Sequence, residues 1–223
     1  MKLKEFSLWG FKLELVESRK FTLFNRCVCA HFERHFEPIE TDGVYRIVIK
    51  LSEPDERAGT NELSSSVLKF YKEFNFSLFY SLDELSRKKQ LLDVLYESLI
   101  QLCDLFGWPK DNFNKAYELV IKDNYLNVYS IKKKSNRNKT LCAELTCDHS
   151  TDSFECYILV KDKLGKEIYH KLLFSEEPDE FMFNGRIGDI KWLSNDILVH
   201  LKKDKTELER FEFKKGAKLI KNP

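Results

Sequence analysis

Glycine and proline are scarce in this chain, with 8 glycines and 5 prolines among 223 residues. This scarcity excludes collagen-like chains and flexible glycine-rich or proline-rich proteins. Long apolar runs are missing too, since no segment approaches the roughly 18 residues that a membrane-spanning helix needs. We therefore expect a soluble globular protein without a membrane partner. Its length allows a sizeable core without help from a metal or a disulfide.

An excess of charge of either sign is also missing. The chain carries 37 lysines and arginines against 36 aspartates and glutamates, a formal net charge of +1. Proteins that bind nucleic acid owe much of their affinity to positive charge that faces the phosphates. The balance therefore disfavours nucleic acid as a partner. A dense basic run at 132–139 is interpreted as the solvated tip of a hairpin.

The short motifs of the best-known enzyme sites do not occur. G-x-S-x-G, G-x-G-x-x-G and G-x-x-x-x-G-K-[ST] are all absent. Their absence argues against a serine-hydrolase elbow and against the glycine-rich loops that hold phosphates. We expect no cofactor. An active site assembled only in three dimensions stays open, because geometry and not a motif defines such a site.

The N-terminal residues indicate whether the six cysteines are expected to form disulfides. Lys2, Lys4 and Glu5 stand where a secretory signal needs an apolar segment. We therefore expect a cytoplasmic protein, and in that compartment thiols stay reduced.

Two groups of residues combine cysteine and histidine, which are common zinc ligands. The first group is Cys27, Cys29, His31 and His35, and the second is Cys142, Cys147, His149 and Cys156. We expect the first group on a strand, where its members share one face but spread over more than about 20 Å. The second group spans two expected strands and their loop. We expect no metal at either group, although the sequence alone leaves the question open.

Aromatic residues are abundant, with 18 phenylalanines, 9 tyrosines and 3 tryptophans. Such residues favour strands and large buried cores. Apolar and alternating runs predict strands at 2–9, 11–17, 21–35 and 44–51, followed by an exposed loop at 52–66. Residues 1–80 are therefore predicted to be a β-rich region.

A helical hairpin is predicted over 81–123. Ser81 and Glu84 fit a capping box at the start of a long helix. An apolar stripe follows at steps of three, four or seven residues, and Gly107 ends the helix. A second, shorter helix is expected at 111–123.

After this hairpin the apolar residues alternate with polar ones again, with the period of two that is typical of strands. Strands are predicted at 125–133, 140–147, 154–161, 167–174, 180–184, 187–193, 197–202 and 207–213. Their connections are short, and short connections join antiparallel strands. Residues 124–223 are therefore predicted to form an antiparallel β-meander. The whole chain is predicted to be one integrated α+β domain of antiparallel β-sheets with a central helical hairpin.

One acidic run is the candidate partner-binding site. It consists of Glu176, Glu177, Asp179 and Glu180, followed by Phe181 and Phe183. Carboxylates beside aromatic side chains suit a surface that binds a basic protein, because charge steers approach and aromatics anchor the contact. We favour a non-enzymatic protein-binding module, such as an inhibitor or immunity protein that neutralises a toxic basic enzyme. The alternative is a hydrolase or transferase whose cysteine, histidine and carboxylate groups meet only in three dimensions.

Overall fold

The computed structural model describes residues 1–214 and 218–219. The fold is of the α+β class and has a C-terminal series of antiparallel strands, as the sequence predicts. The chain divides into two compact units, Met1–Asn127 and Val128–Pro223. No helix within the described residues is both long and apolar enough to span a membrane.

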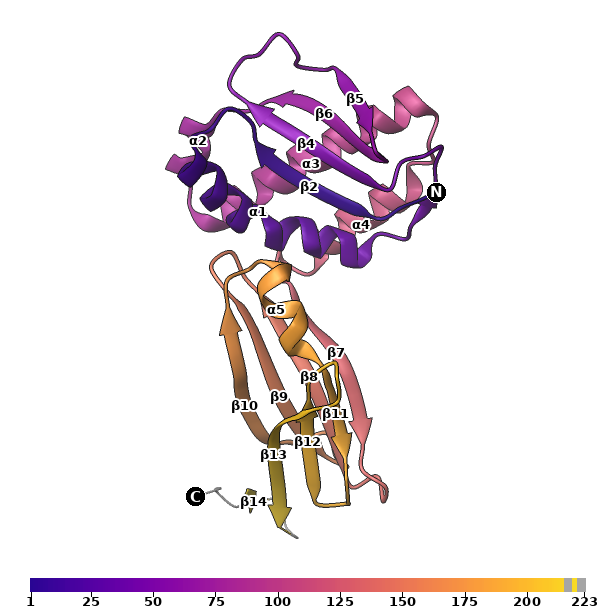
Figure 1. The fold of residues 1–223 in the computed structure, drawn as a ribbon, viewed down its shortest axis with the longest axis vertical. Coiled ribbons are helices and arrows are strands. Elements are labelled where there is room, and N and C mark those ends of the chain that lie inside the picture. Colours follow the sequence, from indigo (N-terminus) through magenta and orange to yellow (C-terminus); the bar gives the residue numbers. More distant parts are fainter. Residues whose placement is uncertain (215–217, 220–223) are drawn as a thin grey trace. The chain divides into compact units, whose positions relative to one another are not determined.

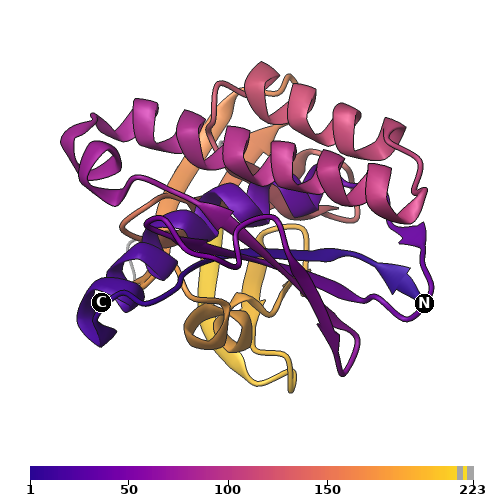
Figure 2. The same cartoon turned by 90° about the horizontal axis from the view of Figure 1, so that it is seen from above.

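The first unit combines a sheet with helices. Its strands are β1 (Lys2–Leu3), β2 (Glu5–Gly10), β3 (Ile39–Glu40), β4 (Arg46–Ser52), β5 (Asn61–Ser64) and β6 (Val67–Glu73). Its helices are α1 (Leu15–His35), α2 (Phe76–Ser81), α3 (Glu84–Phe106) and α4 (Asp111–Lys122). The main sheet has the order β2-β4-β6-β5, in which β2, β4 and β6 are parallel and β5 is antiparallel to β6. Helices α1, α3 and α4 lie on one side of this sheet (Figures 1 and 2).

Helix α1 covers the predicted strand at 21–35 and the last three residues of the predicted strand at 11–17, so both strand predictions are wrong. Its buried residues include Phe21, Asn25 and Phe32, whose spacing follows the 3.6-residue period of a helix. The helix has 21 residues, whereas strands in globular proteins usually have 3 to about 10. The alternation of cysteines and histidines in this segment therefore does not reflect a strand. Strand β2, helix α1 and strand β4 therefore form a parallel crossover unit within the region where antiparallel pairing is predicted.

Aromatic rings fill the space between the sheet and the helices. Phe6 on β2 is fully buried, and its ring centroid lies 5.3 Å from that of Phe32 and 4.9 Å from that of Phe36. Both contacts are edge to face, the arrangement that the charge distribution of aromatic rings favours. Phe113 on α4 approaches the same ring at 6.2 Å. Phe6 therefore joins the sheet to both α1 and α4.

Helices α3 and α4 confirm the predicted helical hairpin. The start of α3 lies slightly later than predicted, because Asp83 and not Ser81 caps it, accepting a hydrogen bond from Ser86 N at 3.0 Å. Gly107 ends α3 as predicted, with a φ of 68°. Glycine adopts this left-handed conformation without the steric cost that other residues incur.

The second unit is built from two antiparallel sheets. Its elements are β7 (Val128–Ser135), β8 (Leu141–His149), β9 (Phe154–Asp162), β10 (Glu167–Glu176), α5 (Glu180–Ile187), β11 (Asp189–Trp192), β12 (Ile197–Leu201), β13 (Glu207–Lys214) and β14 (Lys218–Leu219). One sheet has the order β10-β9-β8-β7 and the other the order β11-β12-β13-β14. Both sheets contribute to one core, for example through Ile158 and Leu198. The indole Nε1 of Trp192 donates to the Lys134 carbonyl at 2.8 Å, which links β11 to β7.

A helix replaces the strand predicted at 180–184, which is the second correction to the sequence-based elements. Asp179 caps α5 by accepting a hydrogen bond from Phe181 N at 3.0 Å. Gly188 follows the helix with a φ of 59°, and a Cβ at this position would lie 1.8 Å from the Leu201 carbonyl oxygen. Only glycine therefore allows the chain to turn from α5 into β11.

The central place of Phe6 can be tested by replacing it with alanine. We expect Phe6→Ala to lower the free energy of unfolding of the first unit by about 3–5 kcal/mol, because the substitution leaves a cavity among packed rings. Phe181→Ala is the matched control, since this phenylalanine is 96% exposed and should change stability by less than about 0.5 kcal/mol. Urea unfolding followed by far-ultraviolet circular dichroism measures both. Equal effects of the two substitutions would contradict the described core.

Candidate functional site

The predicted acidic run lies at the end of β10 and the start of α5. Glu176 forms an ion pair with Arg186, so its carboxylate already has a partner within the chain. Asp179 is the cap of α5. Glu177 is exposed and Glu180 is half-buried. The four acids therefore lie close together in the chain, and Glu176 and Asp179 are among those with contacts inside the second unit.

The two phenylalanines of the candidate site have opposite surroundings. Phe181 is 96% exposed, and its neighbour Met182 is 50% exposed. Phe183 is buried, with its ring stacked on Phe154 at a centroid distance of 3.6 Å. Phe183 therefore fixes α5 to the core of the second unit, while Phe181 presents an apolar surface to solvent.

The basic run at the tip of the β7–β8 hairpin has partners for part of its charge. Lys133 Nζ lies 2.8 Å from a carboxylate oxygen of Glu144, and Lys134 Nζ lies 2.8 Å from one of Asp189. The hydrogen bond to Glu144 raises the pKa of Lys133, and the same bond lowers the pKa of Glu144. These two lysines thus have carboxylate partners within the second unit.

The second cysteine–histidine group does not converge. Cys147 and Cys156 face each other across β8 and β9, but His149 packs edge to face against the stacked rings of Phe154 and Phe183, 5.5 Å from each. Cys142 lies further along β8. Among the described residues, this group does not bring three ligand atoms together.

The two histidines of the first group contact Asp123, a residue that the sequence analysis does not single out. His31 and His35 each place Nε2 near Oδ2 of Asp123, at 3.0 and 2.8 Å. Of the groups that the described residues form, this one brings three metal-ligating side chains within reach of one another. Cys27 turns away, since its thiol donates to the Phe24 carbonyl. The detectable signal was the four-residue spacing of the histidines, which places them on the same face of a helix.

Burial and charge set the protonation of this His–Asp cluster. Burial lowers the pKa of His31 to about 4, so its imidazole is neutral at neutral pH. The hydrogen bond from His31 lowers the pKa of Asp123, which is therefore ionised there. The Arg34 guanidinium lies 3.7 Å from the same carboxylate oxygen. The cluster thus combines a neutral imidazole with a carboxylate under the influence of one permanent positive charge.

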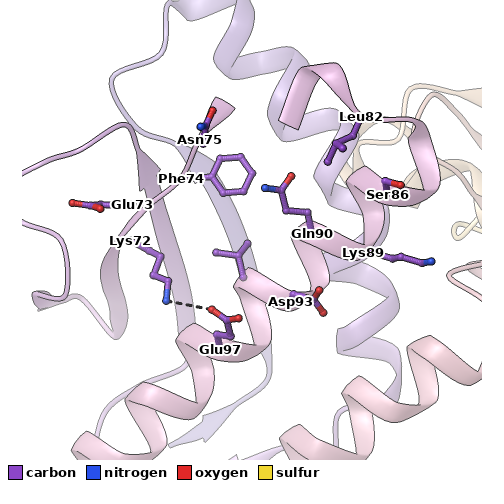
Figure 3. Close-up of a pocket in the computed structure, with 11 residues that line it drawn as sticks. Lys72, Glu73, Phe74, Asn75, Leu82, Ser86, Lys89, Gln90, Asp93 and Glu97 are labelled. Carbon is purple, nitrogen blue, oxygen red and sulfur yellow. Dashed lines mark hydrogen bonds and ion pairs between the residues drawn. The ribbon is translucent and has the colours of Figure 1, made fainter. Parts of the chain in front are cut away.

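A surface hollow of about 450 Å³ lies between β6 and α3 in the first unit (Figure 3). Lys72 Nζ reaches across it to Glu97 at 3.4 Å. Its described lining residues include neither cysteine nor histidine. The hollow therefore does not supply the cysteine, histidine and carboxylate site that the alternative enzymatic hypothesis requires.

Comparison with known proteins adds no assignment. No family model, no curated protein and no solved structure matches this chain. Functional inference therefore depends on the chemistry of the surfaces and clusters described above.

The six thiols should differ sharply in reactivity. Burial raises the pKa of Cys27 to about 12 and that of Cys103 to about 11. At pH 8, about one Cys27 thiol in ten thousand is the reactive thiolate. Cys142 is half-buried, whereas the other five cysteines are buried.

We therefore expect a disulfide-exchange reagent to modify one thiol quickly in the native protein and all six after denaturation. Cys142→Ser should remove the fast phase. Fast modification that persists in Cys142→Ser would show that another thiol is accessible and would contradict the described burial.

Proposed function

We propose that this chain is a protein-binding module that contacts a basic protein through the α5 surface, defined as Glu177, Asp179, Glu180, Phe181 and Met182. The exposure of Phe181 carries the proposal. A side chain of this size gains about 1.5–3 kcal/mol from full burial, which a partner can supply. An inhibitor or immunity protein that neutralises a toxic basic enzyme is the class of protein that suits such a surface.

The rigid attachment of α5, which carries Phe181, supports this role. Phe183 stacks on Phe154, and the Asp179 cap holds the first turn of α5. A helix fixed in this way loses little conformational freedom when a partner binds, and that reduces the entropic cost of association. Phe181 is therefore a preorganised anchor.

The charge around Phe181 indicates the chemistry of the partner. Residues 176–186 hold four acids and one base, Arg186, which gives the segment a formal charge of −3. Arg186 is paired with Glu176. A complementary surface would present lysines or arginines around an apolar pocket for the phenylalanine.

The first test replaces the anchor. With the product of the neighbouring gene as the partner, Phe181→Ala should weaken binding by about 2 kcal/mol or more, roughly 30-fold in Kd. Leu15→Ala is the control, because Leu15 is 85% exposed but lies in the first unit. Surface plasmon resonance measures both. Absence of binding by the wild type, or equal affinity of Phe181→Ala and wild type, would contradict the proposal.

The second test removes two charges, at Glu177 and Glu180, and leaves Glu176 and Asp179 unchanged. The double variant Glu177→Gln/Glu180→Gln should slow association several-fold at low salt and flatten its salt dependence, because peripheral charges act mainly on the association rate. Glu14→Gln/Glu17→Gln is the matched control, with the same spacing on exposed residues of the first unit. Equal association rates for the two double variants would show that the acids of α5 do not steer the partner.

A further inference from the structure

We propose that His31, His35 and Asp123 form a binding site for one zinc ion in the first unit. Imidazole nitrogen and carboxylate oxygen are ordinary ligands of zinc, and three protein ligands leave one position for water. The site uses none of the residues of the α5 surface. It therefore stands or fails independently of the proposed function.

The three ligand atoms already converge. The Nε2 atoms of His31 and His35 lie 3.0 and 2.8 Å from Oδ2 of Asp123, and all three atoms lie within 4.8 Å of one another. Zinc bonds of about 2.0–2.2 Å in a tetrahedron separate the ligand atoms by roughly 3.3–3.5 Å. Binding therefore lengthens the two His–Asp distances by roughly half an ångström. It also brings the two imidazole nitrogens together by at most about 1.5 Å, which small side-chain rotations can supply.

Both elements hold these side chains in place. His31 and His35 are one helical turn apart on α1, so their rings project from the same face. Asp123 ends α4, and the next two residues, Asn124 and Tyr125, have φ values of 52° and 60°. Tyr125 N donates to the Val120 carbonyl at 3.1 Å, which fixes this left-handed turn. Two consecutive left-handed residues other than glycine persist only where their surroundings enforce them.

Two charges at the cluster act in opposite directions on a bound cation. Asp123 lies at the C-terminus of α4, where the negative end of the helix dipole disfavours a carboxylate and favours a positive ion. Arg34 opposes this effect, since its guanidinium lies 3.7 Å from Oδ2 of Asp123 while its Nε donates to Asn127 Oδ1 at 3.1 Å. Because these effects oppose each other, we expect weaker binding than at a structural zinc site with four protein ligands. Zinc takes the two Nε2 atoms, so the imidazole protons move to Nδ1 and metal bonds replace the two His–Asp hydrogen bonds.

Glu33 limits what the site can do. It lies between the two histidines in the sequence, but its carboxylate accepts from Phe6 N at 2.7 Å and pairs with Arg26. In the zinc proteases with H-E-x-x-H the glutamate that acts as general base directly follows the first histidine, whereas Phe32 stands at that position here. Glu33 is engaged with β2 and Arg26, so the proposal is zinc binding alone.

The experiment uses the full chain without an affinity tag, stripped of metal by a chelator and then dialysed. Isothermal titration calorimetry with zinc alone measures stoichiometry and affinity, and cobalt(II) alone reports the ligands by its absorption spectrum. The variants are His35→Gln and Asp123→Asn, which spare the buried His31. His170→Gln is the matched control, because its imidazole is half exposed and lies on β10. Circular dichroism verifies that every variant folds.

The wild type and His170→Gln should bind one zinc ion per chain and melt at a higher temperature with zinc present. His35→Gln and Asp123→Asn should bind at least about tenfold more weakly. The cobalt complex should lack the intense near-ultraviolet band of thiolate ligation. No binding by the wild type, a thiolate band, or wild-type affinity in both folded variants would each overturn the proposal.

Discussion

Helix α1 packs against the sheet on one face and against α4 on another, and the structure of the first unit depends on both contacts. Toward the sheet it presents Phe21 and Phe32, with Asn25 between them. Asn25 Nδ2 donates to the Leu8 carbonyl at 3.2 Å, so this buried amide has a partner on β2. Toward α4 it presents His31 and His35, which meet Asp123. A rotation of α1 by one residue, about 100°, would break both sets of contacts.

The α5 surface and the zinc site each lie on a helix that is packed into a core on one side and presents its binding residues on another. Phe183 fixes α5 in the core of the second unit, and Phe181 on the same helix is exposed. Phe32 fixes α1 in the core of the first unit, and His35 on the same helix is only partly buried. Burial of one face lets the opposite face keep a defined geometry without a ligand. That preorganisation is what binding needs, because the cost of ordering has already been met during folding.

Local periodicity explains which elements the sequence predicts correctly. The helical hairpin and the C-terminal meander are confirmed because their apolar residues repeat with clear periods and end at Gly107 or at short turns. Helix α1 was missed because its polar Asn25 interrupts the apolar stripe, while Cys27 and Cys29 imitate the alternation of a strand. Helix α5 was missed because aromatic residues suggest a strand, although Asp179 after a proline is a typical helix cap.

The His–Asp cluster shows a limit of a different kind. Asp123 is 92 residues from His31 and 88 from His35, so no local pattern connects them. If residues 21–35 formed a strand, the two histidines would be far apart along the extended chain and could not share one site. The correct helix would have placed the histidines together, but the identity of the third residue depends on how α4 packs against α1.

Anomalous X-ray scattering at the zinc edge, from crystals grown with zinc, tests this account most directly. A zinc ion bound there requires the helical register of α1, the packing of α4 against it and the ligand chemistry of the three side chains to be as described. The account predicts an anomalous peak bonded to Nε2 of His31, Nε2 of His35 and the Asp123 carboxylate. A peak confined to other residues, or no peak within reach of the two imidazoles, would contradict it.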